Sequence, residues 1–225
     1  MNVKVLGLGG LAKAGKDTFV GISKNILTKN GYKPIRIAFA DSLKEEVQVV
    51  LKDNGFKVNI SNLSAEQKEE VRPILVFWGC QRRRESEGGL HWVNIADKKI
   101  HKFINTIHNA SDAVGLDLNK LVFLISDCRF PNECEWIHKK WDGEFIHLKR
   151  YSIKLTKTFD PAPNEEELKN DPIIQEMADQ KIEWENKKKM TFDEAINDPY
   201  LQSVVLETLN STKFFKHSTT GILTL

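Results

Sequence analysis

A short apolar strand followed at once by a glycine-bounded loop most constrains how this chain can fold. Residues 3–8 are mostly apolar, and residues 10–18 then read Gly-Leu-Ala-Lys-Ala-Gly-Lys-Asp-Thr. Two glycines let the backbone wrap closely around phosphate oxygens, and the N–H groups of the following helix supply positive potential. The pattern therefore predicts a phosphate-binding P-loop in which Lys16 reaches the β- and γ-phosphates of a nucleotide.

An ordinary turn at Gly9 and Gly10 is the alternative, because short glycine motifs recur by chance. The residues after the loop favour the P-loop, since apolar side chains at 19, 22, 26 and 27 have helical spacing. Asp17 stands where the strict motif has Ser or Thr, and Thr18 follows it. Asp17 could hold Mg²⁺ or cap the helix, and Thr18 could face the metal; the residues alone leave this open.

Length and composition limit the remaining choices. With 225 residues, 40% of them hydrophobic and 28% charged, the chain has the composition of a globular protein, and its net charge of +2 gives no attraction to a nucleic acid polymer. It has no apolar run of eighteen residues and no signal-peptide pattern, so we expect a cytoplasmic protein without a membrane segment. Cys80, Cys128 and Cys134 lack the spacing of a metal site and are expected to be buried reduced thiols.

The second segment combines a strand with charged helices. Residues 34–40 predict a strand, and Asp41 with Ser42 is expected to cap a helix from Leu43 to about Leu51 that carries Lys44. Residues 53–62 are expected to form a loop. Ser64 and Gln67 resemble a capping box for a helix to about Gly79, which Pro73 should kink or restart. A further helix is expected from Leu90 to about Asn109.

Three consecutive arginines, Arg82 to Arg84, follow Trp78 and precede Trp92. They can be a solvated basic patch, as charge runs usually are, or an anion clamp whose guanidinium groups fork onto phosphate oxygens. These features alone do not decide between the two.

A continuous apolar run, residues 121–126, ends in Asp127 and predicts a parallel strand buried on both faces. It resembles a Walker B strand, so Asp127 is expected at the metal and Arg129 in the same crevice, where it could stabilise a transferring phosphoryl group. Asp127 could instead cap a helix near Pro131. Later expectations are a strand over 143–150, a short strand near 194–197 and a helix over 200–209. The charged residues 151–189 could be a lid or only a solvated excursion.

Together these segments resemble bacteriophage-type deoxynucleoside monophosphate kinases. The similarity rests on the Gly-Lys-Asp-Thr ending of the loop, on Ala40-Asp41-Ser42-Leu43-Lys44-Glu45, on Trp78-Gly79 with its arginines and, most specifically, on Asp127-Cys128-Arg129-Phe130-Pro131-Asn132-Glu133.

The resemblance implies an α/β P-loop kinase domain with a parallel sheet flanked by helices: a core over about 1–42, 118–150 and 190–212, a monophosphate-binding insertion over about 43–117, and a lid over about 151–189. It implies transfer of phosphate from Mg·ATP to a deoxynucleoside monophosphate in a cell's cytoplasm, that of the host for a phage protein, and leaves a homodimer open. The ATP phosphates would lie on Gly10, Leu11, Ala12, Lys13, Ala14, Gly15, Lys16, Asp17 and Thr18. Lys16, Asp127 and Arg129 would be catalytic, and Asp17, Thr18 and Asp127 would hold the metal. The acceptor would contact Asp41, Lys44, Arg72, Trp78, Arg82, Arg83, Trp92 and Arg129, with Trp78 or Trp92 stacking on its base.

Two other functions stay open. Animal-type phosphomevalonate kinases are similar in the Lys-x-Gly-Lys-Asp loop and the Ser-Asp-x-Arg strand end, and a non-catalytic nucleotide-binding module would keep Lys16 and Asp127 alone. The family's His-x-Ser-Glu string after Arg150 is absent here, so no lid residue is assigned.

Overall fold

The computed structural model describes residues 3–114, 117–152, 165–186, 190–216 and 222–225. The chain divides into two compact units, one formed by Met1–Ile37 with Ile104–Leu225 and the other by Ala38–Phe103. The P-loop and the Asp127 segment belong to the first unit, whereas the residues expected to hold the acceptor, other than Arg129, belong to the second.

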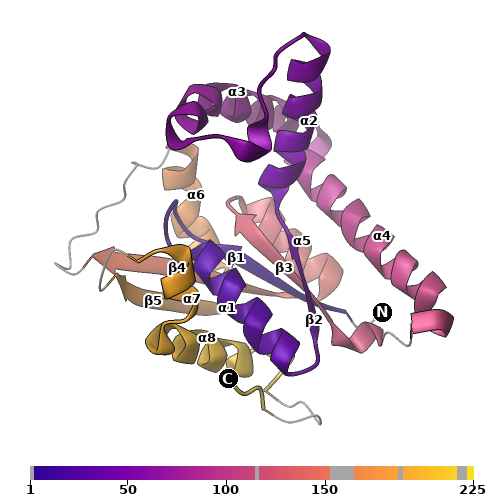
Figure 1. Cartoon of the computed structure of the whole chain (residues 1–225), viewed down its shortest axis with the longest axis vertical. Coiled ribbons are helices and arrows are strands. Elements are labelled where there is room, and N and C mark those ends of the chain that lie inside the picture. Colours follow the sequence, from indigo (N-terminus) through magenta and orange to yellow (C-terminus); the bar gives the residue numbers. More distant parts are fainter. Residues whose placement is uncertain (1–2, 115–116, 153–164, 187–189, 217–221) are drawn as a thin grey trace. The chain divides into compact units, whose positions relative to one another are not determined.

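A five-stranded parallel sheet forms the centre of the first unit (Figure 1). Its strands are β1 (Lys4–Gly9), β2 (Lys33–Ile37), β3 (Leu121–Cys128), β4 (Glu144–Ser152) and β5 (Gln180–Asn186), in the order β2-β3-β1-β4-β5. All four strand pairings are parallel. The expected α/β class with a helix-flanked parallel sheet is confirmed in this form, which is compatible with a P-loop kinase fold and not specific to it.

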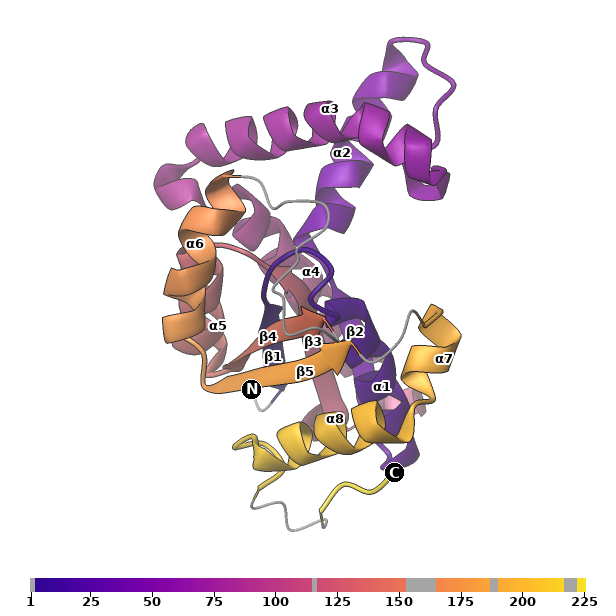
Figure 2. The same ribbon diagram turned by 90° about the vertical axis from the view of Figure 1, so that its left-hand side faces the viewer.

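Helices cover both faces of this sheet (Figure 2). Helices α1 (Lys16–Lys29) and α8 (Pro199–Ser211) pack on one face, where the inward side chains of β1, β3, β4 and β5 form the main core. Helices α5 (Pro131–Trp141) and α6 (Glu165–Glu176) pack on the other face. There Gly7 and Gly9 leave room, since a Cβ at Gly7 would lie 2.3 Å from Ile137 Cδ1. Helix α7 (Phe192–Ile196) packs on α1, and a short 3₁₀ helix, η3, covers Leu118–Lys120.

The second unit is helical. It contains α2 (Phe39–Asp53), the 3₁₀ turn η1 (Ile60–Asn62), α3 (Ala65–Arg84), the 3₁₀ turn η2 (Glu87–Gly89) and the first half of α4 (His91–Val114). Val47, Ile60 and Val71 form a small buried cluster between these elements. The expected capping box starts α3: Gln67 N donates to Ser64 Oγ at 3.2 Å, and Ser64 N donates to Gln67 Oε1 at 3.0 Å.

Several expected elements differ in the structure. Residues 192–196 form a helix, not a strand, because Thr191 and Glu194 make a capping box. Helix α2 begins at Phe39, so Asp41 lies in its first turn and is not its cap. Helix α3 runs as one element from Ala65 to Arg84 with Pro73 inside it, so the helix does not restart there.

The segment expected as a lid, 151–189, is also different. Residues 180–186 form β5 at the edge of the central sheet. Ile182 and Trp184 alternate with charged residues along this strand, and their side chains are buried. Residues 153–164 and 187–189 of that segment lie outside the described residues.

Candidate functional site

The loop between β1 and α1 combines left-handed backbone conformations with the start of a long helix. Gly10 and Gly15 have φ angles of 123° and 93°, and Lys13 has a φ of 60°. A Cβ at Gly10 would lie 2.2 Å from the carbonyl oxygen of Leu148 on β4, so that only glycine fits there. The loop ends at the N-terminus of α1, whose first N–H groups have no intrahelical partners and favour an anion.

Lys16 begins α1, and its ammonium group turns back into the loop. Its Nζ donates to the carbonyl oxygens of Gly10 at 2.7 Å and Leu11 at 2.9 Å. Burial lowers the pKa of Lys16 to about 8, and the Arg129 guanidinium lowers it as well, while the carboxylates of Glu167, Asp127 and Asp17 act in the opposite direction. Lys16 therefore shares one electrostatic environment with the end of β3 and the start of α6.

The end of β3 lies beside the end of β1. Gly7 pairs with Ile125 and Gly9 with Cys128, so the register shifts where β3 reaches Ser126 and Asp127. Such bulges re-aim side chains at functional sites. The parallel pairing brings Asp127 and Arg129 to the same sheet edge as the P-loop, where ligands of open α/β sheets bind. The structure thus brings together Lys16, Asp127 and Arg129, as the sequence predicts.

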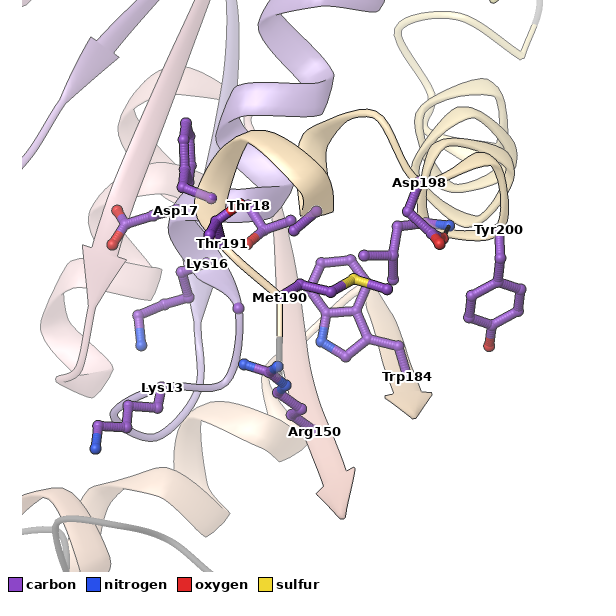
Figure 3. A pocket seen from close by; sticks show the side chains of 14 residues that line it. Lys13, Lys16, Asp17, Thr18, Arg150, Trp184, Met190, Thr191, Asp198 and Tyr200 are labelled. Carbon is purple, nitrogen blue, oxygen red and sulfur yellow. Dashed lines mark hydrogen bonds between the residues drawn. The ribbon is translucent and has the colours of Figure 1, made fainter. Parts of the chain in front are cut away.

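A pocket of about 330 Å³ opens beside the P-loop (Figure 3). Lys13, Gly15, Lys16, Asp17 and Thr18 line one part, and the rest comes from β4, β5 and the segment from residue 190 to the first turn of α8. That remaining lining is largely apolar and aromatic, with a few polar groups: Arg150, Trp184, Met190, Thr191, Phe192, Ala195, Asp198, Tyr200 and Leu201. Its volume is that of a small-molecule site.

Trp184 joins this pocket to the loop and was missed by the sequence reasoning. Its indole Nε1 donates to the carbonyl oxygen of Ala14 at 2.8 Å, and its ring lies where a Cβ of Gly15 would be. The sequence feature that indicates this strand is the alternation of Ile182 and Trp184 with charged residues. It is hard to recognise because the whole segment is highly charged.

In the second unit, Glu46 connects three of its neighbours. Its Oε2 accepts from Trp78 Nε1 at 2.9 Å and Arg82 Nε at 3.0 Å, and its Oε1 lies 3.0 Å from His91 Nε2. Burial raises the pKa of Glu46, but the hydrogen bonds from Trp78, His91 and Arg82 outweigh it and leave this pKa below its ordinary value. Arg82 also lies over the Trp78 ring, 5.5 Å from its centre. Neither Glu46 nor His91 was among the expected site residues.

The other expected acceptor residues of this unit differ in their surroundings. Arg72 forms an exposed ion pair with Glu69 on its own helix, with Nη2 2.7 Å from Oε1, and ten residues of helix place it about 15 Å from Arg82 along the axis. Trp92 is 2% exposed and donates from Nε1 to Gly79 O at 3.1 Å, a burial that argues against a base stacking on its ring. Arg83 is half-buried at the end of α3, and Lys44, like Asp41, lies in the first two turns of α2.

No protein-family model matches this sequence, and no curated protein matches it. In the part of the chain that the structure describes, no three His, Cys, Asp or Glu side chains gather as a metal site. Among the same residues, no helix combines the length and the apolar character needed to cross a membrane.

Proposed function

We propose that this chain transfers the γ-phosphoryl group of Mg·ATP to a deoxynucleoside monophosphate and so forms the diphosphate. The observation that carries the proposal is the meeting of three charged side chains, Lys16, Asp127 and Arg129, at the carboxyl ends of two paired strands. Lys16 begins a helix directly after a loop with left-handed residues at Gly10, Lys13 and Gly15, which supports the proposal. Two cations and one carboxylate beside a phosphate-binding loop suit phosphoryl transfer, in which negative charge must be held and neutralised.

The reaction asks little covalent chemistry of the protein. The acceptor phosphate is already an anion, so its oxygen can attack the γ-phosphorus in line with the departing ADP oxygen, and no general base is required. Lys16 and Arg129 would neutralise charge on the transferring group. The main contribution of the protein is then to hold two phosphates in line.

The residues at this site can bind Mg²⁺ together with the phosphates of a nucleotide. Mg²⁺ keeps several waters and usually takes only one or two carboxylates together with phosphate oxygens, so a cluster of three acidic ligands is not needed. Asp127, Asp17 and Thr18 are the residues that would hold it directly or through water. When bound, the ion would supply positive charge that neutralises the phosphate groups.

The pocket beside the P-loop would hold the nucleoside part of ATP. It adjoins Gly15 to Thr18, and Trp184, Met190 and Tyr200 offer apolar surface to a base (Figure 3). For the acceptor, Arg82 is the best-supported residue: Glu46 fixes its Nε, and none of its described contacts involves the two terminal nitrogens. A guanidinium held in this way presents its fork to a phosphate.

A coupled assay of ADP release tests the proposal. The purified chain with Mg·ATP is offered dAMP, dCMP, dGMP, dTMP, their ribose counterparts and phosphomevalonate. We expect turnover with one or more deoxynucleotides and its loss in Lys16→Ala, whereas Lys24→Ala, an exposed change on the same helix, should keep it. Turnover with phosphomevalonate alone would overturn the proposal in favour of a phosphomevalonate kinase. ATP binding without turnover of any acceptor would favour a non-catalytic nucleotide-binding module.

A further inference from the structure

Arg129 is held at its backbone by a buried carboxylate. Glu133, in the first turn of α5, is 0% exposed. Its Oε2 accepts from the backbone N–H of Arg129 at 2.6 Å and of Phe130 at 3.1 Å. Hydrogen bonds to a charged acceptor are stronger than neutral ones. Glu133 therefore fixes the backbone of Arg129 and Phe130, directly after the end of β3.

The other end of Arg129 is held by a second carboxylate from a distant part of the sequence. Its Nη1 donates to Oε1 of Glu167, in the first turn of α6. The Glu167 side chain is 10% exposed, whereas that of Arg129 is 42% exposed. Helix α6 is anchored to β1 by Ile174, which is 2% exposed and whose Cδ1 lies 3.1 Å from the position that a Cβ of Gly9 would take.

Glu167 also acts on Lys16, because its charge raises the pKa of that ammonium group against the effect of burial. Lys16 itself donates to two carbonyl oxygens of its own loop. Both cations that should meet phosphate thus interact with oxygens of the chain itself. A carboxylate and a phosphate occupy the same fork of a guanidinium group, so the two compete for it.

We propose that Glu167 takes the place of a phosphate group on Arg129 in the free protein, and that Glu133 is the positioning residue that keeps Arg129 in place when the two exchange. The inference rests on the phosphate site of the proposed function. On phosphate binding, the Arg129 guanidinium transfers its hydrogen bond from Glu167 to a phosphate oxygen. The carboxylate and the phosphate repel each other, so the first turn of α6 moves away.

Calorimetric titration with inorganic tripolyphosphate tests the exchange without any need for turnover. Glu167→Gln removes the competing charge and should tighten binding roughly three- to tenfold. Glu165→Gln, two residues earlier and exposed, is the matched control and should leave binding unchanged. In an Arg129→Gln background, Glu167→Gln should bring a clearly smaller gain, since the guanidinium for which they compete is absent and only the repulsion between Glu167 and the phosphate is relieved.

Glu133 should have the opposite effect. Glu133→Ala is expected to weaken tripolyphosphate binding several-fold, while Glu135→Ala, exposed on the same helix, should not. In the Arg129→Gln background the Glu133→Ala effect should vanish, whereas a general loss of structure would persist there. If Glu133→Ala does not fold, Glu133→Gln tests the same coupling, because its amide lacks the charge.

The outcomes separate this inference from the proposed kinase activity. Weaker or unchanged binding in Glu167→Gln would overturn the exchange, as would no binding in both the natural chain and this variant. A gain in Glu167→Gln in a protein that phosphorylates none of the acceptors would support the exchange and remove the kinase.

Discussion

The indole Nε1 of Trp184 donates to the carbonyl oxygen of Ala14 at 2.8 Å, which ties the edge strand β5 to the P-loop. The ring occupies the space in which a Cβ of Gly15 would stand, 2.5 Å from Trp184 Cζ2. Only glycine can therefore both take the left-handed conformation at position 15 and leave room for this ring. The loop conformation is determined by a residue 169 positions later in the sequence as much as by its own glycines.

The first prediction concerns this contact. Gly15→Ala combines an unfavourable φ of 93° with a clash against Trp184, so it should lower the free energy of unfolding by about 2–3 kcal/mol and ATP affinity by more than tenfold. Gly31→Ala is the matched control, because Gly31 has a φ of 76° with nothing within 4 Å of a Cβ. It should cost about 1 kcal/mol and leave ATP binding unchanged. Urea unfolding and calorimetry measure both, and equal losses in the two variants would refute the clash.

The sequence predicts the local parts of this site better than the contacts across it. The glycine-bounded loop, the buried strand that contains Asp127 and the position of Arg129 each follow from a continuous stretch of sequence, and the structure places all three at one edge of the sheet. Trp184 and Glu167 come from the charged segment expected as a lid. No local sequence pattern predicts that the strand of Trp184 pairs with β4 or that Glu167 binds Arg129. Their roles depend on the order of strands in the sheet, which periodicity does not give.

The helical unit shows the same limit. The capping box at Ser64 is a local signal and is confirmed, whereas Glu46 has three partners from α3 and α4 that lie 32 to 45 residues away. The helix start at Phe39 was also missed, since Asp41 and Ser42 resemble a cap but lie inside the first turn. A cap residue and a first-turn acid are both favourable at a helix start, so the sequence alone does not separate them.

The second prediction follows from the pKa of Lys16, which burial lowers to about 8. In the proposed function the charged ammonium group of Lys16 contacts the ATP phosphates, so ATP affinity should fall as pH rises above about 8, by at most tenfold per pH unit. Lys16→Arg stays charged over this range and should lose the pH dependence even if it binds less tightly. Titrations between pH 7 and pH 9.5 check this, and a flat profile in the natural chain would show that Lys16 is not the titrating contact.

The third prediction is the effect of the same group on stability. Lys16 releases its proton near pH 8 in the folded chain but near 10.5 when unfolded, so between these values the unfolded chain binds more protons. The contribution of Lys16 to the free energy of unfolding must therefore rise with pH across this window. Lys16→Met, which has no titrating group, is the comparison. The free energy of unfolding of the natural chain minus that of Lys16→Met should increase from pH 8 to pH 10, and a constant difference would contradict the lowered pKa.

The fourth prediction tests Glu46 as the centre of the helical unit. Glu46→Ala removes the acceptor of Trp78, Arg82 and His91 and should lower the free energy of unfolding by about 1–3 kcal/mol. Glu45→Ala, the neighbouring change, removes only an exposed pair with Lys99 and should cost less than about 0.5 kcal/mol. Thermal or urea unfolding compares them.

The kinetics of the same two variants connect Glu46 to the proposed acceptor site. If Arg82 holds the monophosphate, Glu46→Ala should raise the KM for the deoxynucleotide several-fold and leave the KM for ATP unchanged, because Arg82 loses the partner that orients it. Glu45→Ala should change neither constant. A rise in the KM for ATP alone would place Arg82 outside the acceptor site.

The fifth prediction uses the three thiols. Cys128 and Cys134 are both 0% exposed, and burial raises the pKa of each above its ordinary value, whereas Cys80 is half-buried on α3. The thiolate is the reactive form, so an aromatic disulfide reagent at pH 8 should modify Cys80 alone in the folded chain. The Cys80→Ser variant should then show no fast reaction. In urea, Cys128 and Cys134 should become accessible and react as the sheet unfolds. Fast reaction of two thiols in the folded chain would mean that β3 and α5 open locally, and with them the segment that carries Arg129.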